Sequence, residues 1–148
     1  MNAKKHKIAF FGSDEIALPF LGSLNEAGFE VSAALTQPDR RSGRGRKLQP
    51  NAIKQWAIKS GVPCRDPQKP SNEDKEWLNS IGIELIIVMA YGHMLKLDLL
   101  EVASLGCFNL HASVLPFYRG ASPIETALAS GEKETGVTLM RIVPRMDA

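Results

Sequence analysis

Asn109 and His111 have the side chains and the spacing that carbonyl chemistry requires. On an extended strand, residues two apart project from the same face, whereas Leu110 between them projects from the other. An amide and an imidazole on one face can both donate hydrogen bonds to an oxygen that gains negative charge when its carbonyl carbon is attacked. The pair therefore favours an oxyanion-stabilising site, although a single buried Asn or His is more often a hydrogen-bonded structural residue.

The segment after this pair has the composition of a loop at the end of a strand. Ser113 is followed by the Leu115-Pro116 turn and then by Arg119-Gly120. In open α/β sheets, ligands bind in the crevice outside the carboxyl ends of the strands. The polar pair thus stands where such a sheet would bind its ligand.

The elements that must position this pair alternate along the chain. Short apolar runs alternate with amphipathic stretches, which predicts βα units around a mostly parallel sheet. The predicted strands cover residues 7–11, 30–35, 62–65, 85–89, 106–111 and 136–143, and the predicted helices cover 15–27, 52–60, 72–81, 97–104 and 123–130. Several helices end at a glycine, at Gly28, Gly61, Gly82 and Gly131. The expected fold is α/β and Rossmann-like, a mostly parallel twisted sheet with helices on both faces.

Two loops, 36–51 and 112–122, each follow a predicted strand, so both are expected on the same rim of the sheet. The 148 residues suffice for one domain with its own core, and 44% hydrophobic and 23% charged residues are ordinary values for a globular protein. The longest apolar run, residues 85–90, is far short of the roughly 20 residues that span a bilayer. Residues 1–7 lack the apolar region of a signal peptide, so a cytoplasmic location without membrane contact is expected.

Other chemistries find little support in the sequence. Cys64 and Cys107 lie far apart and outside any metal-ligand spacing, which predicts reduced apolar residues. Residues 11–14 lack the spaced glycines of a dinucleotide fingerprint, so a tight turn with Ser13 or Asp14 as N-cap is expected in place of an NAD site. No cluster of metal-ligating residues is visible, and no metal is expected.

Residues 37–47 form a strongly basic segment with two glycines. Its cations are Arg40, Arg41, Arg44, Arg46 and Lys47. The formal net charge of +2 is too small to require a polyanionic partner by itself. Two interpretations remain open: a solvated charge run, or a flexible loop that grips an RNA backbone and orders on binding.

These motifs together resemble the formyltransferases that use 10-formyltetrahydrofolate, and most of all the amino-terminal domain of the methionyl-tRNA formyltransferases. Asn109, His111 and residues 113–116 carry the resemblance, with Val114 where the family usually has Leu. Residues 36–40 and 43–45 of the basic loop match the family as well. The resemblance implies transfer of a formyl group from 10-formyltetrahydrofolate to the α-amine of initiator methionyl-tRNA, a step of translation initiation.

The resemblance also implies roles for single residues. Asn109 and protonated His111 would donate hydrogen bonds to the formyl oxygen, while Asp147 would hold His111 and relay a proton through water. Folate contacts are implied at Ser113, Val114, Leu115, Pro116, Met89, Tyr91, Gly92 and Val143. The tRNA acceptor arm would be engaged by Arg40, Arg41, Arg44, Arg46 and Lys47. No metal takes part, and a monomer is expected.

Several alternatives share these features. Glycinamide ribonucleotide formyltransferases, formyltetrahydrofolate hydrolase domains and sugar-nucleotide formyltransferases would use the same Asn, His and Asp, but a small acceptor gives no reason for five clustered cations. A different class is a non-catalytic folate- or RNA-binding module. Because members of the resembling family are longer, residues 1–148 are expected to be the amino-terminal catalytic domain, incomplete at its C-terminal end and without the carboxyl-terminal tRNA-binding β-barrel domain.

Overall fold

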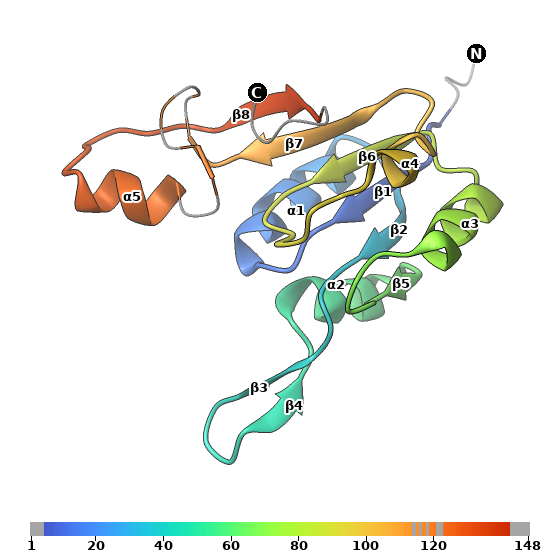
Figure 1. Cartoon of the computed structure of the whole chain (residues 1–148), viewed down its shortest axis with the longest axis horizontal. Helices are drawn as coiled ribbons and strands as arrows, with labels where there is room; N and C mark the ends of the chain where they lie inside the picture. Colours follow the sequence, from blue (N-terminus) through green and yellow to red (C-terminus); the bar gives the residue numbers. More distant parts are fainter. Residues whose placement is uncertain (1–4, 114, 116, 118, 121–122, 143–148) are drawn as a thin grey trace.

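A six-stranded sheet forms the centre of the molecule in the computed structural model (Figure 1). The structure describes residues 5–142 except 114, 116, 118, 121 and 122. The strands follow the order β5 (Cys64–Arg65), β2 (Val31–Leu35), β1 (Ile8–Phe11), β6 (Leu85–Val88), β7 (Cys107–His111) and β8 (Thr138–Arg141). The first five strands are parallel and β8 is antiparallel to β7. All six predicted strands are therefore found, and the mostly parallel α/β sheet is confirmed.

The helices match the predicted pattern with two differences at their ends. They are the 3-10 helix η1 (Glu15–Ala17), α1 (Leu18–Glu26), α2 (Ala52–Ser60), α3 (Asn72–Ile81), α4 (Leu97–Leu100) and α5 (Pro123–Ala129). The helix predicted from residue 15 opens as η1, capped by Asp14, whose carboxylate accepts a hydrogen bond from the Ile16 amide at 2.9 Å. The helix predicted to residue 104 ends at 100, since residues 102 and 103 donate to carbonyls only three residues back. Within the described residues, no helix has the length and apolarity of a membrane span.

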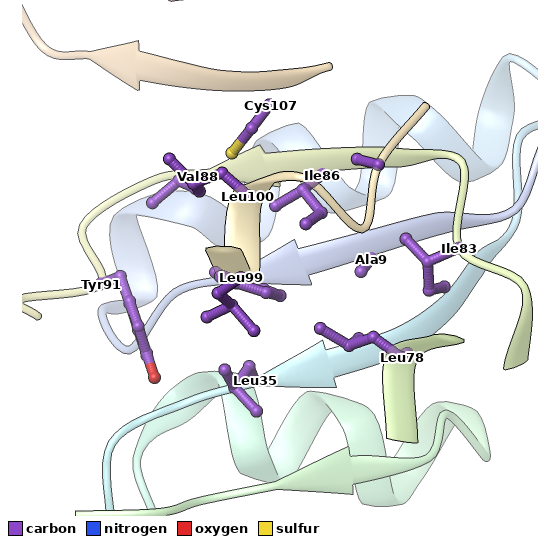
Figure 2. Packing of buried hydrophobic residues seen from close by; sticks show 13 residues of the cluster. Ala9, Leu35, Leu78, Ile83, Ile86, Val88, Tyr91, Leu99, Leu100 and Cys107 are labelled. Carbon is purple, nitrogen blue, oxygen red and sulfur yellow. The ribbon is translucent and has the colours of Figure 1, made fainter. Parts of the chain in front are cut away.

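Alternate residues of the central strands fill two apolar layers, one on each side of the sheet. Ala9 and Val88 belong to the layer under α3 and α4, where Leu78 and Leu99 pack over the sheet (Figure 2). Phe10, fully buried, belongs to the opposite layer, which α1 and α2 cover. Each such buried side chain contributes roughly 1.5–3 kcal/mol relative to exposure. Helices therefore cover both faces, as predicted, and the sheet is a firm base for whatever lies at its edge.

The basic segment is a separate antiparallel hairpin, β3 (Arg40–Ser42) paired with β4 (Lys47–Gln49), which projects away from the sheet (Figure 1). The sequence predicted a flexible loop here and did not predict this backbone pairing. The chain reverses at residues 43–46, where Gly43, Gly45 and Arg46 have positive φ values of 72°, 84° and 47°. Glycine reaches this region without strain, so the two glycines make the turn possible.

Candidate active site

An open cleft of about 980 Å³ lies at the carboxyl ends of the parallel strands. Its wall comes from residues 88–95 after β6, 109–112 at the end of β7, Ser13 and Asp14 after β1, four residues of the basic segment, and the first turn of α5. The volume is at the upper end of the range for small-molecule sites. Both predicted loops thus contribute to the same cleft, as their shared rim required.

Asn109 and His111 line this cleft from β7. Leu110 between them packs against the layer under α1 and α2, whereas Cys107, two residues before Asn109, belongs to the opposite layer. The two polar side chains therefore leave the same face of the strand, as the spacing predicted. Asn109 pairs with Val88 of β6 on one side and with Met140 of β8 on the other, and His111 pairs with Thr138 of β8.

The two side chains differ in their surroundings. His111 is buried, with 5% of its surface exposed. Asn109 is half-buried, and its amide has no hydrogen-bond partner among the described residues. An amide that faces a cleft without a protein partner can give both its donor and its acceptor to a ligand.

The turn after β6 forms a second side of the cleft. Met89 is buried and its amide still bonds to the β1 backbone, to the Phe11 carbonyl at 2.9 Å. The chain then turns sharply, with Ala90 at φ 51° and Gly92 at φ 83°. A non-glycine residue held at positive φ costs of order 1–3 kcal/mol, which the surrounding contacts must offset. This turn is thus a defined feature of the cleft wall.

Tyr91 takes part in the site through its backbone. Its side chain is 2% exposed, packs against Phe11 with ring centroids 5.7 Å apart, and points into the apolar layer (Figure 2). Burial raises the pKa of the Tyr91 phenol. The Tyr91 carbonyl, in contrast, accepts hydrogen bonds from Ser13 Oγ at 3.2 Å and from Gln37 Nε2 at 2.8 Å. The contact implied for Tyr91 can therefore come from its main chain alone.

A polar network that the sequence did not reveal fixes the rim between β1, β2 and α2. Thr36 is fully buried and donates to Asn51 Oδ1 at 3.0 Å. Asn51 caps α2 by accepting from its first amides, and its Nδ2 donates to the Gln37 carbonyl at 3.0 Å. An Asn directly before a helix is the available sequence sign of such a cap. The contacts of Asn51 with Gln37 and Thr36, which lie 14 and 15 positions earlier in the chain, have no such sign in the sequence.

Within the part of the chain that the structure describes, Ser113 and Leu115 do not line the cleft. Ser113 is fully buried, and its Oγ donates to the Phe117 carbonyl at 2.7 Å. The Thr138 hydroxyl donates to the Ser113 carbonyl at 2.6 Å and accepts from the Leu115 amide at 3.1 Å. These bonds tie the loop after β7 to β8. Val114, Pro116, Val143 and Asp147 lie outside the described residues, so their predicted roles are not tested by the geometry.

The five cations of the hairpin are all exposed. Arg40 alone among them lines the cleft, where its guanidinium donates to Gln37 Oε1. Arg41 donates to the Arg46 carbonyl at 3.2 Å, which links the two arms of the hairpin. The hairpin therefore presents its charge to solvent and touches the cleft at its base.

An ion-pair cluster anchors the base of the hairpin to α2. Lys54 lies between Asp39 and Asp66, with Nζ to carboxylate oxygen distances of 2.8 and 2.9 Å. Hydrogen bonds to Asp39 and then Asp66 raise the pKa of Lys54 above its ordinary value of 10.5. Since all three side chains are partly exposed, solvent screens these pairs and each contributes little to stability.

The two cysteines are not nucleophiles. Burial raises the pKa of the Cys64 thiol to about 11 and also raises that of Cys107. The thiolate is the reactive form, so both groups stay unreactive at neutral pH. Across the residues that the structure describes, no group of three or more His, Cys, Asp or Glu side chains could hold a metal ion.

Fold and site together define a domain of the α/β class, with two polar side chains, Asn109 and His111, in a cleft at the carboxyl end of a central strand. The family described as "Formyl transferase" matches residues 6–148, and the chain belongs to this family. The resemblance seen in the sequence is thereby confirmed.

Sequence and structure comparisons with individual proteins agree with this family membership. The chain is 47% identical over 143 residues to the methionyl-tRNA formyltransferase of Methylococcus capsulatus, and 45% identical over 145 residues to that of Moorella thermoacetica. Both matches cover 96% of this chain and 46% of the relative, so the chain spans less than half the length of these relatives. The crystal structure of phosphoribosylglycinamide formyltransferase from Bacillus halodurans has the same fold, with a TM-score of 0.74, 22% identity, and coverage of 96% of this chain and 74% of that one.

Proposed function

We propose that this chain provides the catalytic domain of an enzyme that transfers a formyl group from 10-formyltetrahydrofolate to the α-amine of initiator methionyl-tRNA. One observation carries the proposal: Asn109, whose amide has no partner among the described residues, and His111 line the cleft from one face of β7, in a chain that belongs to the formyl transferase family. The names of the relatives at 45–47% identity favour the methionyl-tRNA acceptor.

In this reaction the bound folate supplies the formyl carbon that the amine attacks. Asn109 Nδ2 and the His111 imidazole would donate hydrogen bonds to the formyl oxygen as it gains negative charge. Because pairing with β6 and β8 holds Asn109 and pairing with β8 holds His111, these donors need little reorganisation when the charge develops, which is the main source of such stabilisation. Asp147 would orient His111 and relay the proton that leaves the amine to N10 of the folate, so that the bond between N10 and the formyl carbon breaks and tetrahydrofolate leaves.

The cleft has a composition that suits a folate. Its wall combines apolar side chains such as Met89 and Ile142 with backbone groups of the turn at Tyr91 and Gly92. Gly92 adds no side chain of its own to this wall, and the Gln37 amide fills the position that a Cβ would take. Met89, Tyr91, Gly92 and Val143 would contact the pterin. Ser113 and Leu115 would act on the folate by shaping the loop that Ser113 braces, and Val114 and Pro116 would contact it.

The exposed cations favour an RNA acceptor over a small one. Arg and Lys side chains neutralise phosphates without reading sequence, and a projecting ribbon beside the cleft can reach the backbone of an acceptor arm. Glycinamide ribonucleotide and a sugar nucleotide carry only a single phosphate or diphosphate group, which would engage few of these cations, and water would engage none. The cytoplasmic location and the monomeric state stay predictions from the sequence.

A two-acceptor assay tests the proposal. The protein as its gene encodes it is incubated with 10-formyltetrahydrofolate and either methionyl-tRNA or glycinamide ribonucleotide, and release of tetrahydrofolate is followed by absorbance. We expect release with methionyl-tRNA alone. Turnover with glycinamide ribonucleotide or without any acceptor would contradict the proposed substrate. Binding of both folate and tRNA without any turnover would favour the non-catalytic module.

A further inference from the structure

Gln37 joins the basic hairpin to the wall of the cleft. It stands between β2 and β3, and both ends of its side-chain amide are engaged. Nε2 donates to the Tyr91 carbonyl at 2.8 Å, while Oε1 accepts from the Arg40 guanidinium. Its backbone amide donates to Ser13 Oγ at 3.1 Å, and its carbonyl accepts from Asn51. Five segments of the fold therefore meet at this one residue.

The side chain of Gln37 also fits the turn after β6 closely. A Cβ atom on Gly92 would lie 2.2 Å from Gln37 Nε2, so the amide occupies the space that any other residue at 92 would need. Gly92 and Ala90 both have positive φ, and the Tyr91 carbonyl between them is the acceptor for Gln37. The position of the Gln37 amide and the shape of this turn thus specify each other.

The Arg40 guanidinium also holds the side-chain amide of Gln37, at its oxygen. A guanidinium has five N–H donors in a fixed plane, so Arg40 can hold Gln37 Oε1 and a phosphate oxygen at the same time. An RNA phosphate that fixes the exposed Arg40 side chain would then fix Gln37, and through it the Tyr91 carbonyl. The wall of the cleft is then already ordered when the folate binds. The folate loses less free energy in ordering the protein, and it therefore binds more tightly.

We propose that Gln37 is a positioning residue that couples RNA binding at the hairpin to folate binding in the cleft, an inference that rests on the proposed function. RNA and folate then strengthen each other's binding, and by linkage the factor is the same in both directions. A factor of about five or more is expected, at the lower end of the usual range for coupled sites. Gln37 would contact neither the formyl carbon nor the attacking amine. Its substitution should therefore change the coupling between the two binding affinities.

The test measures that dependence directly. The Kd of 5-formyltetrahydrofolate, used as a stable reduced-folate probe, is determined for the protein as its gene encodes it, with and without saturating uncharged initiator tRNA at one salt concentration. In the wild type, tRNA is expected to lower this Kd about fivefold or more. Gln37→Ala removes both contacts of the amide and brings the ratio close to one.

Two further variants keep the test decisive. Gln37→Glu keeps an acceptor for Arg40 and loses the donor to the Tyr91 carbonyl, so it too is expected to give a Kd ratio near one. If Gln37→Ala does not fold, Gln37→Glu tests the coupling in its place. Gln49→Ala is the matched control, because Gln49 also lines the cleft from the hairpin, on β4, and it should keep the wild-type ratio.

The outcomes separate the coupling from the function. A wild type that binds both ligands with a ratio of one would overturn the coupling and leave the proposed function standing. So would Gln37 variants that keep the wild-type ratio, even with weaker folate binding throughout, since that is the pattern of a merely structural residue. A wild type that binds neither folate nor tRNA would overturn both proposals.

Discussion

The end of β7 and the basic hairpin border the same cleft, but their side chains are held in opposite ways. Asn109 and His111 stand on a strand with a partner on each side and with apolar layers above and below the sheet. The hairpin pairs with itself alone, and every residue of its two strands is exposed. Stabilisation of a developing charge requires donors placed to within about half an ångström, whereas attraction of a polyanion by cations tolerates movement. The molecule thus has a rigid region suited to chemistry and a projecting region suited to recognition.

The largest expected effect tests the rigid region. Asn109→Ala should lower kcat by roughly a hundredfold or more, since loss of one oxyanion donor costs about 3 kcal/mol of transition-state stabilisation. Its melting temperature should change little, because the amide has no partner among the described residues. Formyl transfer to methionyl-tRNA and a thermal melt measure the two quantities.

The matched control is Asn79→Ala, on the exposed surface of α3. It should keep full activity. Wild-type turnover in Asn109→Ala would remove the oxyanion role from β7 and with it the distinction between the two regions.

The second prediction tests the projecting region. Changing Arg44, Arg46 and Lys47 to Gln should weaken tRNA binding about tenfold or more at 0.1 M salt and reduce the slope of log K against log salt by about 0.7–0.9 for each lost phosphate contact. The value of kcat at saturating tRNA should stay unchanged, because none of the three lines the cleft. Filter binding at two salt concentrations measures the affinity and the slope.

A charge-matched control separates the hairpin from net charge. It changes three exposed lysines elsewhere to Gln, namely Lys59, Lys69 and Lys133. This variant should bind tRNA almost as the wild type does. Equal losses in both variants would mean that the hairpin is ordinary solvated surface.

The rigid region was largely predictable from the sequence. Six strands, the faces of the helices and the shared side of Asn109 and His111 all follow from periods of two and 3.6 residues. These signals are local, because each depends on residues within one element. The family resemblance added the implied roles, which spacing alone did not provide.

The rest depended on contacts between distant segments. Gln37 meets Ser13 and Tyr91 across 24 and 54 residues, and nothing in the local sequence marks such a pairing. The hairpin was missed for another reason: its two strands are exposed on both faces and so lack the alternation of apolar and polar residues that marks a half-buried strand.

Two glycines with nearly the same φ sharpen the comparison. Gly92 in the cleft wall has φ 83° and Gly45 in the hairpin turn has φ 84°, so alanine at either position meets the strain of positive φ, about 1–2 kcal/mol. A Cβ at 92 also displaces the Gln37 amide, whereas a Cβ at 45 has no neighbour within 4 Å. Gly92→Ala should therefore lower the free energy of unfolding by about 1 kcal/mol more than Gly45→Ala, the value of the hydrogen bond lost. Urea unfolding of the two variants gives the difference, and equal losses would show that the turn after β6 is no more constrained than the hairpin.

The smallest effect concerns the point where the two regions join. Lys54 anchors the base of the hairpin, and its pKa in the folded protein is raised above 10.5 by Asp39 and Asp66. A lysine whose pKa is raised by folding contributes stability that is fully present below its unfolded pKa and is lost as the pH rises through the folded value. Lys54→Met should therefore be less stable than the wild type by less than about 1 kcal/mol at pH 8, with allowance for the solvent exposure of all three side chains.

The pH dependence of that difference is the decisive measurement. By pH 11.5 the wild type has begun to lose the contribution of the charged amine, so the gap between wild type and Lys54→Met in urea unfolding should narrow. Lys59→Met, an exposed change in the same helix, should give a small gap that is the same at both pH values. A Lys54→Met gap that does not change with pH would mean that the methylene stem of Lys54, and not its charge, holds the hairpin to α2.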